Sequence, residues 1–360
     1  MTPARVLVLN PGSSSLKASV VVEPGDRTDA SRDIDWGISD AGAGARLAAL
    51  ERLVSELRHG RRIDAVGYRV VHGGELFRDP VLVDDGTVEA IEALDELAPL
   101  HNRVAVETIR AGRRLLPDLP HVACFDTSFH ATLPVDAYRY PLPGKWVERF
   151  GIRRFGFHGL SVAWSVERAA AELGRPAGEL RLVVAHLGSG CSVTAVDRGR
   201  SAATSMGFTP LEGLMMGTRS GSIDPGIVLH LARHAVEVER IADGLEHQSG
   251  LLGASGTTAS ARGLEQAAAS GDERARVAIA MFCRSAAAGI AAAATALDGC
   301  EGIVFTAGIG EHSQSIREDV CRRLSVLGVG QPGGPAVLVV EAREDLVIAR
   351  RAASVIGFGQ

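Results

Sequence analysis

Residues 6–17 read VLVLNPGSSSLK, a short apolar run that leads into a turn of glycine and serine. A second apolar run follows at residues 18–22, so this segment predicts a strand–turn–strand hairpin. The same order returns at residues 182–196, where the turn is Gly188, Ser189 and Gly190. The two turns lie about half a chain length apart. We interpret this echo as a sign of two halves that arose by duplication.

Apolar runs alternate with helical stretches along the rest of the chain, which indicates an α/β fold. An amphipathic helix is expected near residues 47–57. A length of 360 residues predicts two or three domains. The expected strands are residues 6–9, 66–71, 122–125, 182–185, 303–306 and 337–340.

Composition excludes several classes of protein. The net charge is −5 and the basic residues form no block, which argues against a nucleic-acid partner. The most membrane-like stretch, residues 277–297, is mostly alanine and carries Arg284, so we expect a soluble helix and no membrane partner. The five cysteines are scattered and none stands in Cys-x-x-Cys spacing, which favours a reducing, cytoplasmic location.

Three turns have the composition of anion sites, because glycine and serine expose backbone N–H groups and hydroxyls that phosphate oxygens accept. They are residues 10–15 with Lys17, residues 188–190, and residues 308–310. The third directly follows the expected strand 303–306 and precedes a helix with a Ser315-x-x-Glu318 capping box. None is a Walker A loop. A structural turn remains the alternative for each one taken alone.

Two arginines and a histidine stand in unusual surroundings. Arg69 interrupts an apolar strand, and Arg219 is flanked by small residues. Such a guanidinium is accessible for bidentate binding of a carboxylate or phosphate, although a structural salt bridge is an equal interpretation for Arg69. His158 stands between Phe157 and Gly159. It is either a hydrogen-bonded core residue or a group that neutralises charge on a transferred phosphoryl.

Carboxylates complete this set. Asp126 directly follows the expected strand 122–125, and in α/β folds the carboxyl ends of strands face the site. Glu344 and Asp345 follow the last expected strand, where Mg²⁺ bound to a nucleotide could sit. For Asp345 we prefer the interpretation of a helix cap.

These segments together resemble the acetate kinase (acetokinase) family of the actin/hexokinase superfamily over almost the whole chain. The block at residues 205–221 is the most specific of them. The segments are residues 6–17, 69–75 (RVVHGGE), 99–102 (PLHN), 125–130 (FDTSFH), 151–159 (GIRRFGFHG), 186–190 (HLGSG), 205–221 (SMGFTPLEGLMMGTRSG), 305–311 (FTAGIGE) and 344–349 (EDLVIA).

The resemblance implies reversible transfer of a phosphoryl group from ATP to acetate, giving acetyl phosphate and ADP, with Mg²⁺ as the cation and Mn²⁺ as the alternative. It also implies a homodimer. The implied fold is two α/β domains of the actin/hexokinase type, related by duplication, with the active site in the cleft between them. We expect one domain at residues 1–130 plus 347–360, because the last helix returns to it, and the other at residues 131–346.

The resemblance also implies a role for individual residues. Asp126, His158 and Arg219 are the expected catalytic residues, and Asn10 and Glu344 are expected to place the metal. Acetate is expected to contact Arg69, Val71, Leu100, Phe157 and Pro210. The residues expected to line the nucleotide are Lys17, His186, Leu187, Gly188, Ser189, Gly190, Ser260, Ala261, Arg262, Gly308, Ile309, Gly310, Glu311 and His312.

Several positions depart from the family pattern, and most of them lie near the expected nucleotide. Ser189 replaces an asparagine, Ser260 an aspartate and His312 an asparagine, while Tyr68 and Val162 replace histidines. The chain is also shorter than typical members, mainly at residues 23–61 and before residue 337. These changes leave a pyrophosphate-linked acetate kinase and a catalytically weak nucleotide-binding regulatory protein open as alternatives.

A kinase for propionate or butyrate is a further alternative. Val71 speaks against it, because valine narrows the expected acyl pocket. One methylene changes binding by only about 1–3 kcal/mol, so acetate is a preference here and not an exclusion of longer acids.

Overall fold

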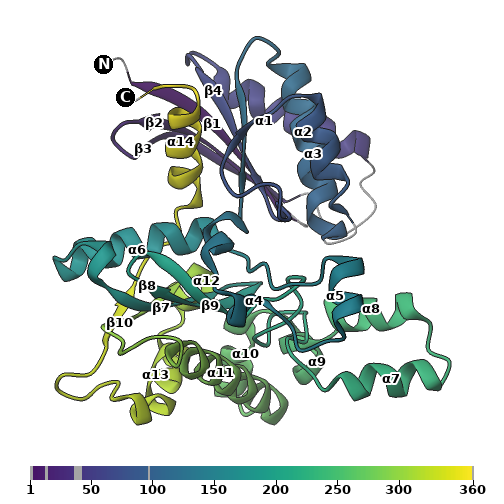
Figure 1. The fold of residues 1–360 in the computed structure, drawn as a ribbon, viewed down its shortest axis with the longest axis vertical. Coiled ribbons are helices and arrows are strands. Elements are labelled where there is room, and N and C mark those ends of the chain that lie inside the picture. Colours follow the sequence, from purple (N-terminus) through teal and green to yellow (C-terminus); the bar gives the residue numbers. More distant parts are fainter. Residues whose placement is uncertain (1–2, 13–14, 36–42, 96–97, 359–360) are drawn as a thin grey trace. The chain divides into compact units, whose positions relative to one another are not determined.

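The computed structural model describes residues 3–12, 15–35, 43–95 and 98–358 (Figure 1). Contacts between residues divide the chain into two compact units. Unit 1 comprises Met1–Ala131, Phe157–Ser161 and Arg343–Gln360, and unit 2 comprises Thr132–Gly156 and Val162–Ala342. The domain boundaries expected from the sequence stay a prediction, because these units are defined by contacts and not by independent folding.

Within the described residues, unit 1 contains a six-stranded mixed sheet in the order β3–β2–β1–β4–β6–β5. The first three strands form an antiparallel meander, and β4 and β6 continue the sheet parallel to β1. The carboxyl ends of β1, β4 and β6 therefore meet at one edge. The strands are β1 (Ala4–Pro11), β2 (Ser15–Glu23), β3 (Arg27–Asp35), β4 (Ala65–Val70), β5 (Val81–Leu82) and β6 (His121–Phe125).

Helices cover both faces of this sheet. Leu7 of β1 shares a buried core with Leu50 and Ile109, which belong to α1 and α3. On the other face Gly67 of β4 lies under α14, since a Cβ there would stand 2.7 Å from Ile348 Cγ2. Burial of both faces explains why these strands read as continuous apolar runs. The helices are α1 (Ala43–Arg58), α2 (Asp85–Glu92), α3 (Pro99–Leu115) and α14 (Glu344–Val355), with the 3₁₀ turn η2 (Ser128–Thr132) after β6.

Unit 2 repeats this topology. Within the described residues its five-stranded sheet has the order β11–β10–β7–β8–β9, where β7, β8 and β9 form the meander and β10 and β11 run parallel to β7. The order matches β6–β4–β1–β2–β3 of unit 1, so the repeat indicated by the two hairpins extends to both sheets, and duplication stays our interpretation of it. The strands are β7 (Arg181–Leu187), β8 (Cys191–Asp197), β9 (Arg200–Thr204), β10 (Gly302–Thr306) and β11 (Ala336–Val339).

Among the described helices, only α11 is long and apolar enough to cross a bilayer by length and composition. It packs against β7 and β8 and against α9, α10 and α13. It is therefore a core helix of unit 2, as its sequence indicated. The helices and 3₁₀ turns of this part of the chain are α4 (Val135–Tyr138), α5 (Gly144–Phe150), α6 (Gly159–Leu173), η3 (Ala177–Glu179), α7 (Pro225–Arg233), α8 (Val238–His247), α9 (Gly250–Ser255), α10 (Ala261–Ala269), α11 (Glu273–Ala294), α12 (Ala307–His312), α13 (Gln314–Arg323) and η4 (Ser325–Leu327).

Every strand and hairpin expected from the sequence is present, and so is the helix near residues 47–57. Strand β3 was not predicted, because RTDASRDID carries the charge of an edge strand and no apolar alternation. The glycine loop at residues 308–310 is itself a short helix, α12. The capping box predicted at Ser315 is wrong. The observed N-cap of α13 is Ser313, whose hydroxyl accepts a hydrogen bond from the Ile316 N–H at 3.2 Å, and the helix starts at Gln314.

The helix-cap interpretation of Asp345 is also wrong. Asp345 lies inside the first turn of α14, and the residue before that helix, Arg343, makes no side-chain cap. The Asp345 carboxylate accepts from Arg343 Nε at 2.9 Å and from the Ser19 hydroxyl at 3.4 Å. Asp345 thus ties the start of α14 to the neighbouring meander.

Candidate active site

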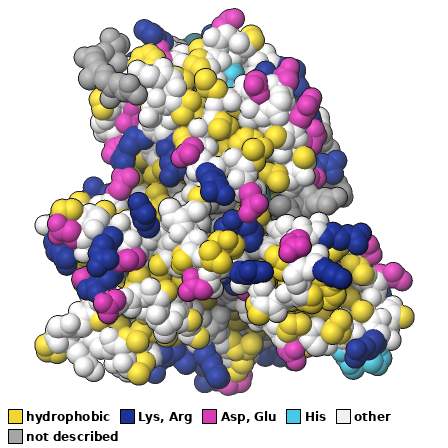
Figure 2. All heavy atoms as spheres, viewed as in Figure 1, with side chains coloured by type: hydrophobic (Ala, Val, Ile, Leu, Met, Phe, Trp, Pro, Cys, Tyr) yellow, Lys and Arg dark blue, Asp and Glu magenta, His cyan; other side chains and the backbone are white. Residues whose placement is uncertain are grey.

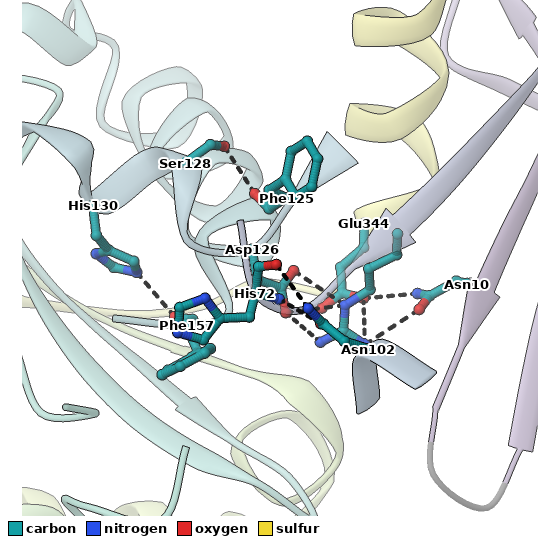
Figure 3. A network of polar contacts seen from close by, with 10 residues as sticks. Asn10, His72, Asn102, Phe125, Asp126, Ser128, His130, Phe157 and Glu344 are labelled. Atoms are coloured by element: carbon teal, nitrogen blue, oxygen red, sulfur yellow. Dashed lines mark hydrogen bonds and ion pairs between the residues drawn. The ribbon is translucent and has the colours of Figure 1, made fainter. Parts of the chain in front are cut away.

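Four polar side chains expected at the site meet at the carboxyl edge of the unit 1 sheet (Figure 3). Arg69, near the end of β4, donates to the Asp126 carboxylate from Nη2 at 2.6 Å and from Nε at 3.1 Å. Its Nη1 lies 3.2 Å from Asn10 Oδ1 and 3.8 Å from Glu344 Oε2. Asn10 Nδ2 donates to Glu344 Oε2 at 2.8 Å. The residues come from β1, β4, the end of β6 and α14, so the sheet topology assembles the cluster.

The electrostatics of this cluster follow from its burial. Burial raises the pKa of Asp126, while Arg69 and the backbone N–H of His158 oppose that rise. Burial lowers the pKa of Arg69, but the charges of Asp126 and Glu344 outweigh it and the net direction is upward. Arg69 therefore stays protonated at any working pH. One cation faces two carboxyl groups, and a divalent cation bound there would favour the ionised forms of both.

The donor set fits Mg²⁺ shared with a nucleotide. Among the residues that the structure describes, no group of three or more His, Cys, Asp or Glu side chains could hold a metal by itself. Asn10, Asp126 and Glu344 offer oxygen atoms, which are the ligands that Mg²⁺ prefers. Proteins commonly bind Mg²⁺ through one or two carboxylates together with substrate phosphates, and these residues could supply that share.

His158 lies beside Asp126 on an unusual turn. Its backbone is left-handed, with φ of +58°, and its N–H bonds the Asp126 carboxylate. The next N–H, of Gly159, donates to the Asp126 backbone oxygen at 2.9 Å. A Cβ at Gly159 would stand 2.2 Å from that oxygen and 2.7 Å from Phe129 Cβ, so only glycine fits there. The turn is pressed against the segment that carries Asp126.

Two residues of the expected acyl pocket, Val71 and Phe157, are buried in unit 1. The ring of Phe157 contacts His72 edge-on, with centroids 5.4 Å apart. Asn102 binds His72 through both backbone groups, each at 3.0 Å. The side chain of Leu100 lies outside the described residues. The fifth residue of that pocket, Pro210, belongs to unit 2.

Several segments expected at the nucleotide lie together in unit 2. Ser189 O accepts from Gly217 N at 3.1 Å. A Cβ at Gly188 would stand 3.4 Å from Ala307 Cβ, and a Cβ at Gly217 would stand 3.6 Å from Ala259 Cβ. The β7–β8 turn, the Gly217 loop, the start of α12 and the residue before the α10 cap are therefore neighbours.

Arg219 is held within the same loop. Its Nη1 donates to the Pro210 backbone oxygen at 2.8 Å. Gly250, with φ of +62°, allows its own backbone to approach that of Arg219 closely, since a Cβ at Gly250 would stand 2.8 Å from the Arg219 backbone oxygen. The structure thus brings Arg219 and Pro210 together, as expected for residues of one site.

A polar brace supports the stretch that contains Pro210. Glu212 accepts from Arg154 Nη2 at 2.7 Å and from the Tyr140 hydroxyl at a shorter distance. The same hydroxyl accepts from Phe208 N at 3.0 Å. The residues that carry Pro210 are thereby tied to the segment at residues 138–156.

The remaining residues expected at the nucleotide occupy varied positions. Ser260 caps α10 by accepting from Gly263 N at 3.2 Å, and Glu311 accepts from Ala342 N at 2.9 Å, so both have structural roles. The others are buried, half-buried or exposed. His186, Leu187, Ala261 and Gly310 are buried, Gly190 and Ile309 are half-buried, and Lys17, Arg262, Gly308 and His312 are exposed.

The expected residues therefore form two sets, one in each unit. That the two sets make one site stays a prediction. No role was expected for Asn102, His130 and Glu212, although all three stand in the segments that carry the resemblance. For His130 and Glu212 the signal was a polar side chain beside apolar neighbours, which must find a partner when it is buried. Asn102 stands between His101 and Arg103 and gave no such signal.

The same sheet topology in both units defines the class of the protein as an α/β fold built on two mixed sheets. A ROK family glucokinase from Streptomyces griseus shares this fold with a TM-score of 0.52 and 15% identity, over 98% of this chain and 99% of that chain.

Closer comparisons identify the family. The chain belongs to the acetokinase family of phosphotransferases, whose model matches residues 5–356. It is 44% identical to the acetate kinase of Deinococcus radiodurans over 98% of each chain. A propionate kinase structure from Francisella tularensis has a TM-score of 0.89 and 34% identity, and covers 98% of this chain and 100% of that chain.

Proposed function

We propose that the chain catalyses the reversible, Mg²⁺-dependent transfer of the γ-phosphoryl group of ATP to acetate, giving acetyl phosphate and ADP. The observation that carries this proposal is the cluster of Asn10, Arg69, Asp126 and Glu344. It places the guanidinium of Arg69 beside oxygen ligands suited to Mg²⁺. The similarity to an acetate kinase over the full chain supports the same reaction.

The chemistry demands charge handling more than base catalysis. Acetate is already anionic, so it can attack phosphorus directly, and the obstacle is its repulsion from the γ-phosphate. Arg69 already holds the Asp126 carboxylate through Nε and Nη2, while its Nη1 has only the longer contacts to Asn10 and Glu344. We assign Nη1 to the carboxylate of acetate.

Two further side chains act on the transferred phosphoryl group in this proposal. Arg219 and His158 stabilise the charge on its equatorial oxygens, as positively charged groups and hydrogen-bond donors do in other phosphoryl transfers. Asn10 and Glu344 place the Mg²⁺, which offsets charge between the phosphates when it is bound.

Acetyl phosphate formation from acetate, Mg²⁺ and ATP tests this proposal, with Arg219→Ala as the control. We expect ATP-dependent turnover that falls by about 10³-fold in the variant. Turnover with pyrophosphate alone would keep the acceptor and replace the donor. A folded protein that binds ADP in a thermal-shift measurement and turns over neither donor would contradict the proposal and favour the regulatory alternative.

A kinase for propionate is the second candidate, because the chain is 34% identical to a propionate kinase over that protein's full length. Val71 is buried at the end of β4 and argues for the smaller acid. We expect kcat/KM for acetate to exceed that for propionate by about tenfold or more, the effect of one methylene. The reverse order would assign the enzyme to propionate.

We further propose a homodimer that forms through α5, α7 and α8 of unit 2. Hydrophobic side chains gather on this face in Figure 2, and Trp146, Phe150, Leu229 and Val238 are 56%, 58%, 55% and 70% exposed. Such a patch is typical of an interface. Light scattering should give twice the chain mass, and Trp146→Glu with Leu229→Glu should give the monomer.

The location we propose is the cytoplasm. All five cysteines are free thiols. Free thiols in a protein of this length suit a reducing compartment, where disulfides are rare.

A further inference from the structure

His130 is a buried polar residue beside the catalytic set that the reaction as described does not use. It lies on η2, four residues after Asp126, and is 1% exposed. Its Nε2 lies 2.9 Å from the backbone oxygen of Phe157 (Figure 3). A carbonyl oxygen only accepts hydrogen bonds, so Nε2 carries the proton and donates. Burial also lowers the pKa of His130 to about 4, which keeps this imidazole neutral at working pH.

The residue after Phe157 is His158, and its backbone is strained. A residue other than glycine is destabilised in this sparsely populated region of backbone conformations. A conformation like this persists only where the surroundings over-determine it, and it concentrates at functional sites. The φ of +58° at His158 therefore requires bonds that hold the peptides on both sides.

The segment from Asp126 to His130 supplies those bonds. The Asp126 carboxylate accepts from the N–H of His158, and the Asp126 backbone oxygen accepts from the N–H of Gly159. His130 holds the opposite side of the turn, at the carbonyl of Phe157. Without this third bond, the peptide that joins Phe157 to His158 could rotate toward a relaxed conformation, and the imidazole would move with it.

We propose that His130 is a positioning residue, which donates Nε2–H to Phe157 and thereby fixes His158 in the orientation that faces the transferred phosphoryl group. The catalytic part of this inference rests on the proposed function. The structural part, a turn locked by His130, does not depend on the reaction.

Two amide variants differ in reach alone. In His130→Gln the Nε2 amide reaches the position of the imidazole Nε2, whereas in His130→Asn the amide stops near the position of Nδ1. We expect kcat to fall by about 10²-fold in H130N, the cost of a misplaced catalytic group, and by less than about fivefold in H130Q. KM for acetate and for ATP should change less than about threefold in both variants, since binding groups stay in place.

A measurement on the wild-type protein covers the case in which H130N does not fold. The ¹⁵N spectrum of the histidine rings should show His130 as the neutral tautomer with the proton on Nε2. Hydrogen exchange should show protected amides at His158 and Gly159, and in H130N these two should exchange at least about tenfold faster than in H130Q.

Each outcome decides the matter. Equal kcat values in the two variants, a proton on Nδ1, or fast exchange at both amides of the wild type would overturn the inference. If the wild type turns over no acetate but the tautomer and the exchange data are as expected, the lock stands and only the proposed function fails.

Discussion

Acid should lower the free energy of unfolding of unit 1 through protonation of His130. The size of this loss follows from the burial of the imidazole. The pKa of this imidazole is about 4 in the folded protein, against an ordinary value of 6.5. Between these values the unfolded chain binds a proton that the folded chain does not, so the free energy of unfolding falls as the pH falls. At 1.36 kcal/mol per pKa unit, lowering the pH from 7.5 to 5 should cost about 2 kcal/mol from this group alone.

Urea unfolding at the two pH values measures the loss, with His130→Gln compared to the wild type. Glutamine keeps a donor for the Phe157 oxygen but does not titrate, so other titrating groups cancel in the comparison. The wild type should lose about 2 kcal/mol more than H130Q between pH 7.5 and 5. Replacement of an exposed histidine, His59→Gln, is the control for removing one imidazole. Equal losses in the wild type and in H130Q would refute the assignment of a buried neutral imidazole.

Three further predictions concern the site. Gly159→Ala places a methyl group 2.2 Å from the Asp126 backbone oxygen and should destabilise the protein by at least about 2 kcal/mol in thermal unfolding. The control is Gly178→Ala, whose methyl group would have nothing within 4 Å and should not lower the stability. Equal melting temperatures of the two variants would contradict the tight fit at Gly159. Glu212→Gln removes the charge that pairs with Arg154, so kcat should fall about tenfold while the far-ultraviolet circular dichroism stays unchanged. Glu344→Gln should raise the Mg²⁺ concentration for half-maximal turnover by at least about tenfold, and an unchanged Mg²⁺ titration would remove Glu344 from the metal site.

Local pattern was sufficient for much of the fold. Strands buried on both faces are continuous apolar runs, and so β1, β4, β6, β7 and β10 could be read directly. The two Gly/Ser turns indicated the two hairpins and the repeated topology. The sequence did not predict edge strand β3, because its solvent-facing, charged residues resemble those of a loop. It did not predict helix α12 either, because Gly308 and Gly310 argue against a helix, while packing after β10 imposes one.

The sequence by itself determined the family and the identity of the charged residues, because a motif fixes which side chains are present. Only the tertiary structure decided their partners. Asp126 and Arg69 pair because β4 and β6 are neighbours in the sheet, although 57 residues separate them. The strain at His158 and its tether to His130 were equally invisible in the sequence. They arise because a chain segment far along the sequence packs against the end of β6, and only that contact holds the backbone in a conformation that histidine rarely adopts.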